Sequence, residues 1–124
     1  MLREGPIPRF FHGVLEYAAG VVFIVAPFAL DFEAGAAVAV AIVVGVAVIG
    51  VAAVTEGPTS LVNSLRIQFH VAFDYALAAF LIASPFLFAF SDESAPTAFF
   101  IAIGVVHILV TIGTRFLRSP EPRR

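Results

Sequence analysis

The sequence contains no cysteine, no tryptophan and no lysine, so all of its positive side-chain charge comes from arginine. Without cysteine the chain forms no disulfide, no thiolate metal site and no thiol nucleophile. Only 13% of its residues are charged, whereas soluble domains carry about 25%. A soluble fold of this size could not cover its surface with so few charges. The formal net charge of −2 gives no general attraction to nucleic acid, which argues against that class of partner.

Apolar residues are abundant instead: 60% of the 124 residues are hydrophobic and the mean hydropathy is +1.02. A helix needs about 20 apolar residues to cross the hydrocarbon core of a bilayer. Four runs of about this length occur, at 12–30, 34–54, 68–90 and 96–116. Because lipid offers no hydrogen-bond partner to the backbone, such runs must be helices. The sequence therefore predicts an all-α fold, a four-transmembrane-helix bundle in contact with the lipid bilayer.

The arginines all flank the predicted spans on one side. They include four topology anchors, which are Arg9, Arg66, Arg115 and Arg118. In the two tight connections on the other side, all charged residues are acidic. They are Asp31, Glu33, Asp92 and Glu93. By the positive-inside rule, we expect a multi-pass protein of the cell membrane, inner or plasma, with both the N and the C terminus in the cytoplasm.

The chain repeats itself at an offset of 58 residues, in the pattern H-x3-[DE]-Y-x9-P-F. The matching residues are His12, Glu16, Tyr17, Pro27 and Phe28 in the first copy and His70, Asp74, Tyr75, Pro85 and Phe86 in the second. This repeat predicts two tandem helical hairpins, 12–54 and 68–116, related by a pseudo-two-fold axis along the membrane normal. A cytoplasmic connection, 55–67, would join them. A cytoplasmic N-terminal segment, 1–11, and a basic tail, 117–124, would flank them.

The Pro-Phe part of the repeat carries a family resemblance. It reads Ser84-Pro85-Phe86 in the second copy and Ala26-Pro27-Phe28 in the first, and it resembles the SPW-repeat family of small bacterial and archaeal membrane proteins, with Phe where that family has tryptophan. The resemblance implies the fold and implies no activity. The sequence also has no phosphate-binding glycine loop, no nucleophile beside a base and no H-E-x-x-H motif. We therefore expect that the protein is not an enzyme.

Proline, glycine and serine suggest how the helices end and pack. Pro27 and Pro85 each remove one backbone hydrogen bond, which predicts a kink that closes the hairpin, with a hinge as the alternative. In the central connection Gly-Pro stops a helix, and Ser60 is a candidate N-cap for an interfacial lead-in to the third span. A stripe of small residues in the second span predicts close helix approach, within the bundle or across a dimer; it comprises Ala37, Ala41 and Gly45.

Histidines and acids form one predicted layer inside the membrane. An i,i+4 spacing puts His12 and Glu16 on one helix face, and His70 and Asp74 on another. A carboxylate inside a span costs about 2.5–3.5 kcal/mol on insertion scales, so both acids should face the bundle interior. His107 reaches a similar depth on the fourth span. We expect this layer to form a polar network together with three hydroxyl side chains, which are Tyr17, Tyr75 and Thr111.

Three interpretations of this layer stay open. In the first, the protein is a non-catalytic structural or interaction module without a cofactor, and the polar network fixes how the helices pack. In the second, the layer binds a transition metal or haem; the candidate ligands are His12, Glu16, His70, Asp74 and His107. In the third, the same layer carries protons or ions across the membrane. A lipid or apolar ligand among the phenylalanines is a further alternative. A second copy of the chain, or another membrane protein, is the expected protein partner.

Overall fold

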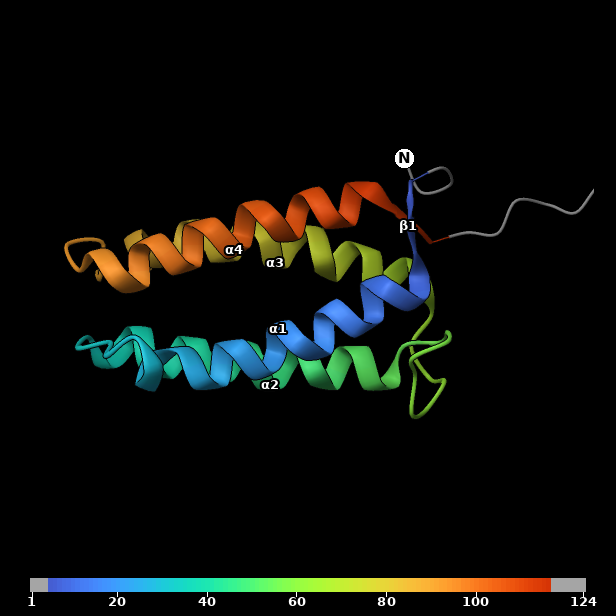
Figure 1. The fold of residues 1–124 in the computed structure, drawn as a ribbon, viewed down its shortest axis with the longest axis horizontal. Coiled ribbons are helices and arrows are strands. Elements are labelled where there is room, and N and C mark those ends of the chain that lie inside the picture. The colour runs from blue at the N-terminus through green and yellow to red at the C-terminus, as the bar shows by residue number, and fades with distance from the viewer. Residues whose placement is uncertain (1–4, 117–124) are drawn as a thin grey trace, which may run out of the picture.

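The fold is a bundle of four helices, shown by a computed structural model that describes residues 5–116 (Figure 1). The helices are α1 (Arg9–Ala29), α2 (Gly35–Val54), α3 (Ile67–Leu87) and α4 (Ser94–Gly113), and two short strands, β1 (Ile7–Pro8) and β2 (Thr114–Arg115), lie at one end. All four helices are long and apolar enough to cross a membrane. The predicted four-helix membrane bundle is thus confirmed. Arg118 and the rest of the predicted tail, 117–124, lie outside the described residues.

The helices pack as two hairpins, α1 with α2 and α3 with α4, as the internal repeat predicts. α1 and α3 begin at the same end of the bundle (Figure 1). We call this end, which holds β1, β2 and the 55–66 connection, the terminal end, and we call the opposite end, which holds the two tight turns, the hairpin end. β1 and β2 pair in parallel, with Ile7 opposite Thr114, so the entry to the first hairpin lies beside the exit from the second.

The stripe of small residues in α2 is used inside the first hairpin. Ala37 and Ala41 are fully buried. Gly45 faces Gly20 of α1 so closely that a Cβ on Gly45 would lie 2.5 Å from the Gly20 carbonyl oxygen. Of the two predicted uses of this stripe, the structure shows close packing within the bundle.

Both hairpins close with the same backbone motif at the hairpin end. Asp31 and Ala89 follow the last turn of α1 and α3 with φ of 50° and 55°, the left-handed conformation. The next residue, a buried phenylalanine in each hairpin, donates its N–H to the carbonyl of Pro27 or of Pro85, at 2.9 Å in both cases. This arrangement is a Schellman motif. Each proline therefore lies in the last turn of its helix and supplies the carbonyl that this motif needs.

Several predicted boundaries differ from the structure for identifiable reasons. α3 ends at Leu87 rather than at residue 90 because the left-handed Ala89 stops it. α4 ends at Gly113 rather than at residue 116 because the next two residues pair with β1. α1 begins at Arg9, three residues before the predicted start, because Pro8 already has the extended conformation of an N-cap.

Ser60 does not cap a helix that leads into the third span, so this part of the prediction is wrong. The N–H groups of Leu61 and Val62 bond the Ala53 carbonyl, and those of Ser64 and Leu65 bond the Val54 carbonyl. The connection thus folds back over the end of α2 and satisfies carbonyls that the helix leaves free. α3 begins only at Ile67, whose N–H donates to the Glu56 carboxylate at 3.1 Å.

Phenylalanines hold the two hairpins together toward the hairpin end. The Phe23 ring of α1 lies 5.1 Å from that of Phe99 and 5.8 Å from that of Phe100, both edge-on, and Phe100 contacts Phe90 at 5.2 Å. Edge-to-face pairs of this kind add to the stabilisation from burial alone. The Glu93 carboxylate also bridges the hairpins, because it accepts the N–H groups of Glu33 and Ala34 at 2.8 and 2.9 Å.

Candidate functional site

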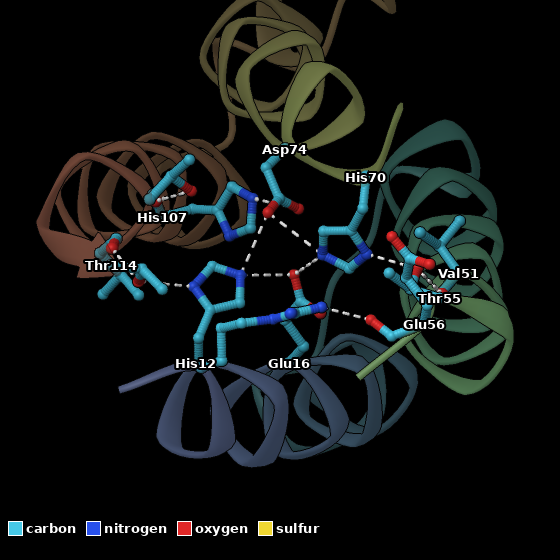
Figure 2. A network of polar contacts seen from close by, with 12 residues as sticks. His12, Glu16, Val51, Thr55, Glu56, His70, Asp74, His107 and Thr114 are labelled. Carbon is cyan, nitrogen blue, oxygen red and sulfur yellow. Dashed lines mark hydrogen bonds and ion pairs between the residues drawn. The ribbon is translucent and has the colours of Figure 1, made fainter. Parts of the chain in front are cut away.

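Near the terminal end, four polar side chains from α1 and α3 converge inside the bundle (Figure 2). They are His12, Glu16, His70 and Asp74, which we call the quartet, and all four are buried, with exposed fractions of 1–5%. In each helix the histidine lies one turn before its acid, so both side chains project from the same face. The structure thus brings together the two repeat-equivalent pairs on which the predicted polar layer rests.

Within the quartet, each imidazole Nε2 contacts both acids. His12 Nε2 lies 2.8 Å from Glu16 Oε1 and 3.1 Å from Asp74 Oδ2. His70 Nε2 lies 2.7 Å from Glu16 Oε1 and 3.2 Å from Asp74 Oδ2. The four atoms alternate nitrogen and oxygen around a closed ring and all lie within 4.8 Å of one another. Two nitrogen and two oxygen donors are thus grouped as they are around a bound metal ion.

Two threonines fix the hydrogen on the other ring nitrogen of each histidine. Thr114 Oγ1 lies 2.8 Å from His12 Nδ1, and Thr55 Oγ1 lies 2.6 Å from His70 Nδ1. Each hydroxyl also donates to the carbonyl four residues earlier in its own helix, at 2.6 and 2.5 Å. A hydroxyl has one hydrogen and a carbonyl only accepts, so each threonine must accept from its histidine. Both Nδ1 atoms therefore carry hydrogen.

Each of the two threonines bonds a histidine of the other hairpin. Thr114 directly follows α4 and bonds the histidine of α1, whereas Thr55 directly follows α2 and bonds the histidine of α3. The same exchange appears in the backbone, because Ile7 pairs with Thr114 and Leu65 pairs with Thr55. Sequence analysis did not assign the two threonines to the site. The available signal was their equivalent position in the two halves of the repeat.

His107 lies beside the quartet but outside its ring of contacts. Its Nε2 is 3.5 Å from Asp74 Oδ1, an ion-pair distance, and neither atom makes a hydrogen bond to the described residues. Position 107 is also where the two halves of the repeat differ. Aligned through Thr55 and Thr114, His107 falls opposite Val48 in the first hairpin.

Within residues 5–116, none of the three predicted hydroxyl partners forms a hydrogen bond to the quartet. Tyr17 donates to the Thr59 carbonyl at 2.9 Å and so ties α1 to the central connection. Thr111 is buried and donates to the His107 carbonyl of its own helix at 2.8 Å. Tyr75 is half-buried and has no hydrogen bond within residues 5–116. A different ring, that of Phe116, covers the quartet at 4.9 Å from the His12 ring.

Three of the four predicted arginine anchors are described, and all three lie at the terminal end. Arg9 donates to the Glu56 carbonyl, Arg115 donates to the Gly5 carbonyl at 3.2 Å, and Arg66 is exposed directly before α3. The fourth, Arg118, lies beyond the described residues. The three described arginines and the acidic turns thus lie at opposite ends of the bundle, and each helix spans the distance between them.

A family model described as SPW repeat domain matches residues 10–114. The chain belongs to the SPW repeat family. The match covers all four helices, so the resemblance seen in the two Pro-Phe segments is confirmed and extends over both hairpins of this SPW-repeat chain. No curated protein and no solved structure matches it.

Two cavities reach the quartet of the SPW-repeat chain. A small one, about 30 Å³, lies at the terminal end between Arg9, Thr55 and Thr59 and touches three members of the quartet. A volume of this size holds about one or two waters. The larger one, about 260 Å³, extends from His107 toward Phe23, between the hairpins, and is lined mainly by apolar side chains.

Proposed function

We propose that this SPW-repeat protein binds one divalent transition-metal ion, of the zinc type, between His12, Glu16, His70 and Asp74. The observation that carries the proposal is the closed ring of two imidazole nitrogens and two carboxylate oxygens, supplied by two helices and buried from solvent. Metal sites in helix bundles are built in this way, from side chains on facing helices.

The donor spacing supports a small ion. Zinc binds imidazole nitrogen and carboxylate oxygen at about 2.0–2.2 Å in tetrahedral geometry, which places neighbouring donors about 3.3 Å apart. The four neighbouring pairs in the quartet are 2.7, 2.8, 3.1 and 3.2 Å apart. To hold the ion, these four distances would expand by a few tenths of an ångström. The nitrogen–nitrogen and oxygen–oxygen distances, which lie within 4.8 Å, would close toward the same value.

The hydrogen positions and the charge support a cation as well. Because Nδ1 of each histidine donates to a threonine, each neutral imidazole presents a lone pair at Nε2. Those lone pairs point at carboxylate oxygens, so only a proton or a cation between them relieves the repulsion. Two neutral imidazoles and two carboxylates carry a charge of −2, which a divalent ion neutralises, as a site inside a membrane requires.

The same geometry argues against two of the alternatives. Haem needs a flat space between its axial ligands, whereas the Glu16 and Asp74 carboxylates fill the space between the two histidines. A proton or ion path would have to continue to the hairpin end. There the core of the described bundle is formed mainly by phenylalanine and other apolar side chains, and the buried Ser84 hydroxyl bonds the Phe80 carbonyl of its own helix.

A structural role is the second candidate, and one observation favours it. The contacts of the quartet and its threonines join α1 and α2 of the first hairpin to α3 and α4 of the second. In that role two protonated imidazoles would pair with the two acids, and the network would lock the hairpins together without a metal.

Metal analysis separates the two candidates. We would purify the full chain in detergent, strip it with a chelator, reload it with Zn²⁺, remove free metal and measure bound zinc by mass spectrometry. The wild type should retain about one zinc per chain. His70→Ala, Glu16→Gln and Asp74→Asn should each lose most of it, because each removes one of four ligands. Thr111→Val is the matched control, since that hydroxyl bonds only its own helix.

The outcomes decide the proposal. Zinc that stays with the wild type and Thr111→Val, and leaves the three ligand variants, supports metal binding. Glu16→Gln and Asp74→Asn are nearly isosteric, so a folded variant without zinc separates lost metal from lost structure. A wild type that retains no zinc, and ligand variants that are only less stable, would support the structural role instead.

We infer further that both termini face the cytoplasm of a cell membrane, since the described arginines lie at the terminal end and acidic turns at the other. The chain has no cysteine, so single-cysteine variants at Glu33 and Asp92 report the topology directly. A membrane-impermeant maleimide should label both from outside intact cells. Labelling of both only after the cells are broken would reverse the orientation.

A further inference from the structure

The larger cavity is open to the lipid side of the bundle. It lies between α1 and α4, and the exposed Leu15, Val22 and Val106 are among its lining residues. Leu77 and Leu81 of α3 are buried and also line it. Its volume of about 260 Å³ is close to the lower end of the range for small-molecule sites.

The cavity exists where the repeat departs from its own symmetry. On α1 it is lined by Leu15, Ala19 and Val22. At an offset of 58 residues, the corresponding positions of α3 hold the larger side chains Phe73, Leu77 and Phe80. The α1 side chains are therefore smaller than their counterparts on α3 and leave more room beside them, and position 107 at this cavity holds a histidine where the other hairpin has Val48.

His107 gives the cavity one polar end. Its Nε2 lies 3.5 Å from Asp74 Oδ1. A hydroxyl both donates and accepts, so it can pair with the other ring nitrogen, Nδ1, in either tautomer. Nδ1 has no hydrogen bond within residues 5–116, and Figure 2 shows it turned away from Asp74. Glu16 lines the same end of the cavity.

From these contacts we infer that the cavity binds a neutral, lipid-soluble compound that carries a hydroxyl group. The hydroxyl pairs with His107 Nδ1, and the apolar body lies among the leucine and valine side chains between α1 and α4. An anionic head, such as a fatty-acid carboxylate, is disfavoured because Glu16 and Asp74 lie at the same end. The inference does not depend on whether the quartet holds a metal.

The test uses the full chain in lipid nanodiscs and radiolabelled 4-hexylphenol, with hexylbenzene as the probe that lacks the hydroxyl. After correction for partitioning into the lipid, the wild type should bind hexylphenol saturably and about five- to tenfold more tightly than hexylbenzene. His107→Val, which copies Val48 of the other hairpin, should abolish this preference while apolar binding remains.

Filling the cavity tests its location. Ala19→Leu and Val22→Phe copy the α3 residues Leu77 and Phe80, and each should weaken hexylphenol binding at least about tenfold. Ala76→Leu adds the same bulk on the exposed face of α3 and should leave binding unchanged. Equal binding of the two probes by the wild type would mean that the cavity holds only acyl chains, and would overturn the inference. Unchanged binding in both filled variants would also overturn it.

Zinc retention is measured on the same samples. His107→Val should keep its zinc, because His107 lies outside the ring of donors. Loss of the hydroxyl preference with zinc retained supports the cavity site on its own. An absence of zinc in every sample would count against the proposed metal site. The cavity site would still be judged by the hexylbenzene comparison and by the cavity-filling variants.

Discussion

At the scale of single residues, the two threonines determine which ring nitrogen of each histidine carries a hydrogen and which faces the acids. Thr55 and Thr114 each accept from an Nδ1–H and pass their own hydrogen to a helix carbonyl. Partners of this kind orient metal-binding histidines and fix which ring nitrogen is free. The quartet therefore has its Nε2 atoms prepared by groups that never touch the proposed ion.

Thr114→Val should weaken zinc binding by about 10–100-fold, the usual effect of losing such a partner. Valine keeps the shape of threonine but leaves His12 Nδ1 without an acceptor in a buried site. Zinc affinity would be measured by competition with a chelator of known affinity. Thr55→Val should behave alike on His70. Thr111→Val serves as the control, and an equal loss in that variant would show a general effect on α4 rather than an effect on the site.

The two histidine–acid pairs of the site could be predicted from the sequence because each pair has helical spacing. Helical periodicity alone places His12 over Glu16 and His70 over Asp74, and the cost of a charge in lipid turns both pairs inward. Periodicity does not predict which threonine, at the end of which helix, bonds each histidine. The threonine contacts depend on the exchange between hairpins, and so their role required the three-dimensional structure.

At the scale of helices and turns, the repeated Pro-Phe segment serves to end a helix. The proline carbonyl accepts the N–H of a buried phenylalanine five residues later, after a left-handed residue. The sequence predicted a kink near this position, yet it did not reveal where the helix stops, because neither Asp31 nor Ala89 is the glycine that usually marks such a turn.

Ala89→Gly should raise the free energy of unfolding by about 1 kcal/mol, since a left-handed conformation costs an alanine about that much and a glycine almost nothing. The measurement is the unfolding midpoint in mixed detergent micelles. Ala79→Gly, in the exposed middle of α3, should instead lower stability by about 1 kcal/mol. If both glycines destabilise equally, the strain argument at Ala89 is wrong.

At the scale of the whole molecule, the two hairpins are joined at three levels of the bundle. Phenylalanines join them toward the hairpin end, and the exchanged strands and threonines join them at the terminal end. The quartet lies between these two regions, with side chains from both hairpins. The composition and the repeat were enough to predict this architecture, since four apolar runs in two matching halves leave few other arrangements.

Because the proposed ion has ligands in both hairpins, it should stabilise the whole bundle. Free zinc at about 100 times its dissociation constant should add about 2.7 kcal/mol to the free energy of unfolding. We would measure the unfolding midpoint of the stripped protein with and without zinc. Asp74→Asn should show little or no increase, whereas an equal increase in that variant would place the stabilising ion elsewhere.

X-ray absorption at the zinc edge tests the central claim most directly. For the stripped and reloaded wild type, the quartet predicts four nitrogen or oxygen neighbours at about 2.0–2.1 Å, together with the scattering signature of two imidazole rings. His70→Ala should lose one of the two rings or the zinc itself. A spectrum with only oxygen neighbours and no imidazole, or a wild type that retains no zinc, would contradict the account.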